Sequence, residues 1–101
     1  MGYYDLVRVS VVGSPGVGPI TLGGAVPGYI DFVDAGVQDG ETVSYGVIDG
    51  VKQEVGHGVY TAATSTLTRS VQASTNDNAL INLTSSAIVY LALTAGDMSL
   101  M

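Results

Sequence analysis

The 101-residue sequence contains no cysteine and no tryptophan. Without cysteine, no disulfide bond and no thiolate metal site can form, so the fold must be stabilised by packing. No hydrophobic run approaches the roughly 20 residues of a membrane-spanning helix, because glycine or a polar residue interrupts each run. The N-terminus also lacks the basic and apolar segments of a signal peptide. We therefore expect a soluble protein that is synthesised in a cytoplasm.

Charged residues are scarce as well, at 12% of the chain. Only three are basic, Arg8, Lys52 and Arg69, against nine acidic residues, and the net charge is −6. Nucleic acids and anionic membranes are poor partners for such a chain, because phosphate binding depends on clustered lysine and arginine. Few charges also leave much neutral surface, which is favourably removed from water by another protein. We therefore expect a subunit of an assembly.

The residue patterns of common enzymes are missing. The single histidine, His57, lies between Gly56 and Gly58, and no Gly-x-Ser-x-Gly elbow accompanies it. The glycine-rich residues 13–18 lack the Gly-Lys-Ser/Thr ending of a phosphate-binding loop, and no helix is expected after them. A two-carboxylate glycosidase cleft is hard to build in so small a domain without tryptophan. We predict that the protein is not an enzyme and binds no cofactor.

Four carboxylates are concentrated in residues 31–41, at Asp31, Asp34, Asp39 and Glu41. Oxygen ligands of this kind suit calcium, but their spacing matches no EF-hand loop. We expect a solvated acidic rim here, and a calcium site is the alternative.

Short alternating runs separated by turn residues dominate the rest of the chain. In residues 5–12, Val7, Val9 and Val11 share one face, as in a half-buried strand. Further strands are expected at 20–22, 67–73, 79–83 and 87–93, with at most one helical turn within 25–37. The last strand is apolar on both faces, which is typical of a strand at the centre of a sheet or pressed against another subunit.

The clearest local signal is a hairpin in residues 42–59. Alternating apolar residues run up to Asp49-Gly50, a dipeptide typical of a type I′ turn, which needs positive φ at both central positions. Gly56 and Gly58 in the second strand predict a bulge or a close backbone neighbour.

Together these patterns predict an all-β fold, a small single-domain antiparallel sandwich or barrel of about seven short strands. The domain would span residues 1–101, with 1–5 as an N-terminal arm and 95–101 as a flexible C-terminal tail. A domain of this length has only a modest core, so we expect a homo-oligomer. The residues predicted at contacts with neighbouring subunits or with another protein of the assembly are Tyr3, Tyr4, Leu6, Val89, Leu91 and Leu93.

The order of glycines and apolar residues is similar to that of a small β-rich structural module of tailed-bacteriophage virions. The matching stretches are Gly16-Val17-Gly18-x-Ile20-x-Leu22, Ala25-x-x-Gly28-Tyr29-x-x-Phe32, Gly40-Glu41-Thr42-Val43-x-Tyr45, Asp49-Gly50, Glu54-Val55-Gly56-x-Gly58-x-Tyr60 and Leu67-Thr68-Arg69, followed by Val71, Ser74, Asn78 and Leu83. The resemblance covers most of residues 5–93. It implies a structural role in a phage head or tail fibre and no catalysis.

We expect the module to stand alone, without the shaft and attachment domain of a tail fibre. We therefore expect a capsid decoration, or cement, protein on the virion surface, bound to the major capsid protein. By analogy with the decoration proteins that it resembles, we expect a trimer on the three-fold positions of the shell. The first alternative is a tail or tail-fibre domain that contributes to host receptor attachment. A small carbohydrate-binding or enzymatic domain is the second.

Overall fold

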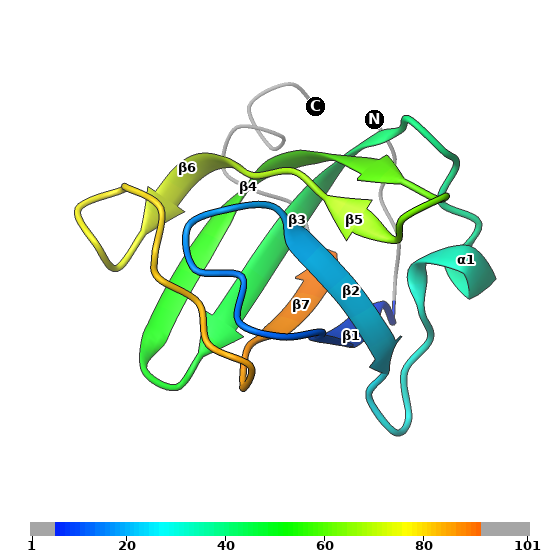
Figure 1. The fold of residues 1–101 in the computed structure, drawn as a ribbon, viewed down its shortest axis with the longest axis horizontal. Helices are drawn as coiled ribbons and strands as arrows, with labels where there is room; N and C mark the ends of the chain where they lie inside the picture. The colour runs from blue at the N-terminus through cyan, green and yellow to red at the C-terminus, as the bar shows by residue number, and fades with distance from the viewer. Residues whose placement is uncertain (1–5, 92–101) are drawn as a thin grey trace.

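The protein is an all-β domain, as expected. The computed structural model describes residues 6–91, so Tyr3, Tyr4, Leu93 and the segments 1–5 and 95–101 lie outside the described residues. The described residues form seven strands and one short helix, and Figure 1 shows their compact arrangement. The elements are β1 (Arg8–Val11), β2 (Ile20–Ala25), α1 (Phe32–Ala35), β3 (Thr42–Asp49), β4 (Lys52–Thr61), β5 (Thr66–Leu67), β6 (Ser70–Ser74) and β7 (Ile88–Leu91).

Six of the strands close into a barrel. The antiparallel pairings run β3-β7-β1-β2-β5-β4, and β4 pairs back onto β3 over the whole hairpin. On its other side, β4 pairs first with β6 at Glu54 to His57 and then with β5 at Tyr60 and Thr61. The sheet is therefore a barrel rather than a sandwich, and β6 leaves the ring at one side (Figure 1).

The barrel interior holds the apolar residues that alternate along the strands. Val7, Val9 and Val11 are buried, as the sequence pattern predicts, and so are Val43, Tyr45 and Val47. Helix α1 is the single helical turn expected in this region. Asp31 caps its first turn, Gly36 ends it with a φ of 89°, and its Phe32 ring lies 5.2 Å from that of Tyr60. Among residues 6–91, no helix is long and apolar enough to cross a membrane.

The β3–β4 hairpin forms where it was expected, but its turn is of another type. Asp49 pairs with Lys52, so the two central residues are Gly50 and Val51. Gly50 has a φ of 65°, whereas Val51 is not among the residues with positive φ. Glycine at the first central position with positive φ only there is the pattern of a type II′ turn, not of type I′. The reason is register, because Asp49 is held in the ladder as the last residue of β3.

The two glycines around His57 are required by close packing of the backbone. A β-carbon at Gly56 would collide with the carbonyl oxygen of Ser70, and one at Gly58 with that of Thr68. The β4–β6 ladder also carries a bulge, because Gly56 pairs with Val71 while Val55 pairs with Ala73. Both features that the glycines predict are therefore present.

Two expected strands differ from the structure. The strand predicted at 67–73 is split into β5 and β6, and the one predicted at 79–83 is absent, apart from an isolated bridge between Leu83 and Gly16. The cause is chemical. The backbone N–H of Ile81 donates to Glu54 and its carbonyl accepts from Arg69, so two buried side chains replace a strand partner.

Candidate binding face

A buried ion pair organises one side of the barrel. The carboxylate of Glu54 and the guanidinium of Arg69 are 2.7 Å apart, and their side chains are 0% and 1% exposed. All five N–H donors of Arg69 are used: two bond Glu54, and three bond the carbonyls of Gly16, Gly18 and Ile81. The carboxylate of Glu54 also accepts from the Ile81 amide and from the Tyr45 hydroxyl, at 3.0 and 2.5 Å.

The pKa values of this network follow from burial and hydrogen bonding. Burial alone would raise the pKa of Glu54, but the bonds from Arg69, Tyr45 and Ile81 outweigh it and hold the pKa below its ordinary value. Burial and the adjacent carboxylate raise the pKa of the Tyr45 hydroxyl well above its usual range. The group is therefore a charged pair with a neutral phenol, and it stays so at neutral pH.

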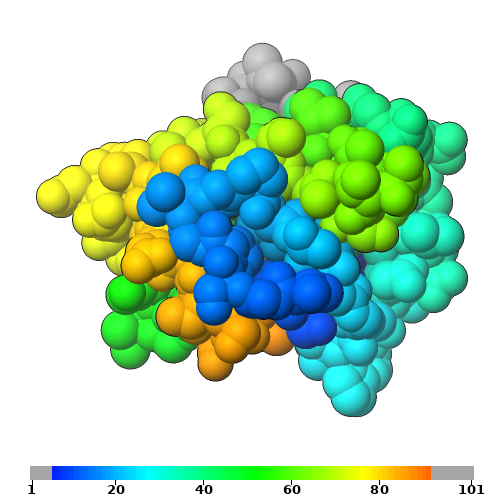
Figure 2. Space-filling model, viewed as in Figure 1, coloured from blue at the N-terminus to red at the C-terminus, as the bar shows by residue number. Residues whose placement is uncertain are grey.

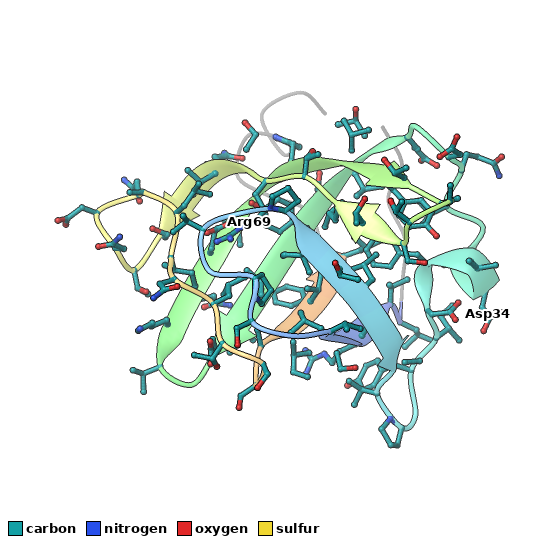
Figure 3. The ribbon with its side chains drawn as sticks, viewed as in Figure 1. Asp34 and Arg69 are labelled. Atoms are coloured by element: carbon teal, nitrogen blue, oxygen red, sulfur yellow. The ribbon has the colours of Figure 1, made fainter. Side chains whose placement is uncertain are left out.

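This network holds loops together and has no donor left for a ligand. Figure 3 shows Arg69 beneath the loop of residues 12–19, and Figure 2 shows this loop against the segment 79–86. The contact between the two segments is the bridge from Gly16 to Leu83. Sequence analysis missed the pair. The available signal was Glu54 itself, which occupies an inward position of an alternating strand, where a carboxylate requires a partner.

Three of the four carboxylates of residues 31–41 accept hydrogen bonds from backbone amides, and the fourth lies at the rim. Asp31 accepts from the Asp34 amide at 2.7 Å, Asp39 from Ala62 at 2.9 Å and Glu41 from Gln38 at 2.9 Å. Asp34 lies at the outer edge of α1 (Figure 3). Within residues 6–91, no three histidine or acidic side chains are grouped so that they could hold a metal ion.

His57 lies half-buried in the middle of β4. The register places Ser44 of β3 opposite it on one side and Ser70 of β6 on the other. A catalytic triad would need a carboxylate to orient the imidazole. The two residues that β3 and β6 place directly opposite His57 are both serines.

The outer surface of strands β1, β7, β3, β4 and β6 forms the candidate binding face. The buried residues of these strands include Val9, Val89, Val47 and Glu54. Side chains alternate along a strand, so the residues directly before and after a buried one in the sequence point outward. The register aligns them in two rows across the sheet. We call them the carboxylate-free face, because they include no Asp or Glu and only one cation: Arg8, Ser10, Ile48, Gln53, Val55, Ala73, Ile88 and Tyr90.

Arg8 is stacked on two tyrosines at one end of this face. Its guanidinium carbon lies 5.0 Å from the ring centre of Tyr29 and 5.6 Å from that of Tyr90. Tyr90 is fixed in turn, because its hydroxyl accepts from the Gln53 amide at 2.8 Å and its ring lies against Gly46, where a β-carbon would collide with it. Beside this face lies a hollow of about 250 Å³ that is lined by Gln53, Glu54, Val55, Ala73, Ser74 and Thr75.

The contact residues predicted from sequence are divided by the structure. Leu6 is 66% exposed and remains available to a partner. Val89 and Leu91 are 0% and 8% exposed, because they are the inward residues of β7 and pack in the barrel core. Their prediction as contacts is corrected accordingly. Ile88 and Tyr90 are the outward residues of this strand, and only the register shows it.

Comparison of the chain with protein-family models, with curated protein sequences and with solved structures found no match.

Proposed function

We propose that the protein is a structural subunit of a bacteriophage virion, a capsid decoration protein that binds the major capsid protein lattice and stabilises it. The proposal combines the sequence resemblance with one structural observation, the carboxylate-free face. Seven of the nine acidic residues lie within residues 6–91, and none of them is on this face. A chain of net charge −6 thus offers a broad surface on which a protein can dock without burying an unpaired carboxylate.

The face also has the composition of a protein contact. Ile48 and Ile88 are cross-strand neighbours and only partly buried, and Tyr90 lies next to them on the same surface. Aromatic residues and arginine are enriched at protein interfaces, whereas acidic residues are depleted at their centres. A subunit that binds only the assembled lattice stabilises it by mass action, and repetition over the shell multiplies the effect. Such a role needs neither catalysis nor a cofactor.

We propose further that the protein is a trimer on the virion surface. Icosahedral shells present three-fold positions, and a closed ring of three subunits matches that symmetry. The exposed Leu6 precedes β1 and is one residue that could reach a neighbouring subunit.

Attachment to a host receptor, as part of a tail or tail fibre, is the second candidate. Tyr29 favours it, because this residue is 39% exposed beside Arg8, and exposed aromatic residues are frequent in receptor contacts.

Two experiments test the proposal. Immunogold labelling of purified virions with an antibody to this protein should decorate the head, and labelling confined to the tail would favour receptor attachment instead. Virions made without the protein should break down at lower temperature than complete ones, and added purified protein should restore their stability. If the purified protein neither binds such virions nor stabilises them, the decoration role is wrong.

A further inference from the structure

The three cations of the chain lie in different environments. Arg69 is buried, and every N–H donor of its guanidinium is occupied. Lys52 is exposed at the β3–β4 turn, where it lines a hollow together with Asn82, and it is not one of the residues of the carboxylate-free face. Arg8 lies on that face, over the rings of Tyr29 and Tyr90. It is the only cation that the outer face of the sheet presents within residues 6–91.

The guanidinium of Arg8 is oriented but not saturated. Its central carbon lies over both rings, and among residues 6–91 its side-chain N–H groups have no hydrogen-bond acceptor and no carboxylate within salt-bridge distance. Tyr90 cannot easily turn away, because Gly46 and Gln53 hold its ring and hydroxyl. An arginine held in this way loses little side-chain entropy when it binds, and its planar fork matches a carboxylate with two parallel hydrogen bonds.

We propose that Arg8 is the centre of the docking contact and that it receives an Asp or Glu side chain of the partner protein. The inference deepens the proposed function and rests on it. Charge complementarity identifies the ligand, because a guanidinium with no acceptor among residues 6–91 lies in a face without carboxylates. The aliphatic Ile48, Ile88 and Val55 lie on the same face, and they identify a protein, because a protein partner would bury them around the charged contact.

The test is co-sedimentation of purified protein with virions that lack it. Arg8→Ala should weaken binding at least about thirty-fold, which is the effect of losing an interface hot spot. Arg8→Lys keeps the charge but loses the fork, so it should weaken binding at least about tenfold. Lys52→Ala is the matched control. It removes one positive charge outside the face and should change the dissociation constant by less than about twofold.

The outcomes separate this inference from the proposed function. If the unmodified protein does not bind the virions, the decoration role is wrong and the docking centre falls with it. If it binds and Arg8→Ala binds equally well, the role stands and the docking centre is wrong. A loss as large in Lys52→Ala would mean that net charge, not this site, drives binding.

Two further measurements keep the test decisive. Thermal melting verifies that each variant is folded, and if Arg8→Ala is not, Arg8→Lys and Arg8→Gln decide the question. Light scattering of the protein alone follows self-association. If Arg8→Ala dissociates the oligomer but still binds virions, the face contacts a second copy, and the proposal is overturned. Polygalacturonate, an acidic polysaccharide, is used as a competitor, and substitutions of Asp and Glu in the capsid protein are tested in parallel. If the competitor displaces the protein only when Arg8 is present, and no such substitution weakens binding, the ligand is not a protein carboxylate.

Discussion

Replacing Arg69 with methionine tests how far the buried ion pair stabilises the fold. The change leaves the carboxylate of Glu54 buried without a counter-charge, and breaking such a pair typically costs about 3–5 kcal/mol of unfolding free energy. It also removes the donors to the carbonyls of Gly16, Gly18 and Ile81. Since domains of this kind are stable by only about 5–15 kcal/mol, Arg69→Met should lower the melting temperature by more than about 10 °C or prevent folding.

A double variant shows which part of the network matters. Replacing a buried ion pair by apolar residues is often neutral, so Glu54→Leu with Arg69→Met would recover stability if the charges alone were important. Here the carbonyls of Gly18 and Ile81 stay without a donor, whereas that of Gly16 keeps the Leu83 amide, and each unsatisfied buried group costs about 1–3 kcal/mol. We therefore expect the double variant to remain destabilised. Urea denaturation measures both variants, and Lys52→Met is the control, expected within about 0.5 kcal/mol of the unmodified protein. If Arg69→Met loses less than about 1 kcal/mol, the reasoning is wrong.

Three other outcomes are expected. The pKa of Glu54 lies below its ordinary 4.5, so its ionised form stabilises the fold above that pH, and this stability is lost as the pH falls through the lowered value. The pKa of Tyr45 is raised above 10.0, so the network also weakens as the pH rises beyond 10. Melting curves against pH measure both arms, and a flat acid arm would contradict the first. Gly50→Val should cost about 1–3 kcal/mol through backbone strain alone, because φ is 65° and no atom lies within 4 Å of the new β-carbon; an unchanged melting temperature would argue against this turn. Leu91→Asp should unfold the barrel, since the charge is buried in the core, and circular dichroism measures this; a folded variant with altered oligomeric state would return Leu91 to a subunit contact.

The sequence by itself determined the local structure of this protein. Alternation placed Val7, Val9 and Val11 on one face, and the same periodicity identified β3 and β4. Gly56 and Gly58 predicted the close approach of a neighbouring backbone, which the structure contains. These features follow from rules that span a few residues, namely the two-residue period of a strand and the steric freedom of glycine.

The tertiary structure decided what depends on contacts between distant segments. Closure of the barrel requires β3 to pair with both β4 and β7, and no local pattern encodes the second pairing. Residues 79–83 alternate like a strand, yet Glu54 and Arg69 take up the backbone groups of Ile81 instead. In β7 both faces are apolar, so the pattern could not say which residues point inward. Register with β1 and β3 buries Val89 and exposes Tyr90 beside Arg8, and in this way the core and the candidate binding face are divided along a single strand.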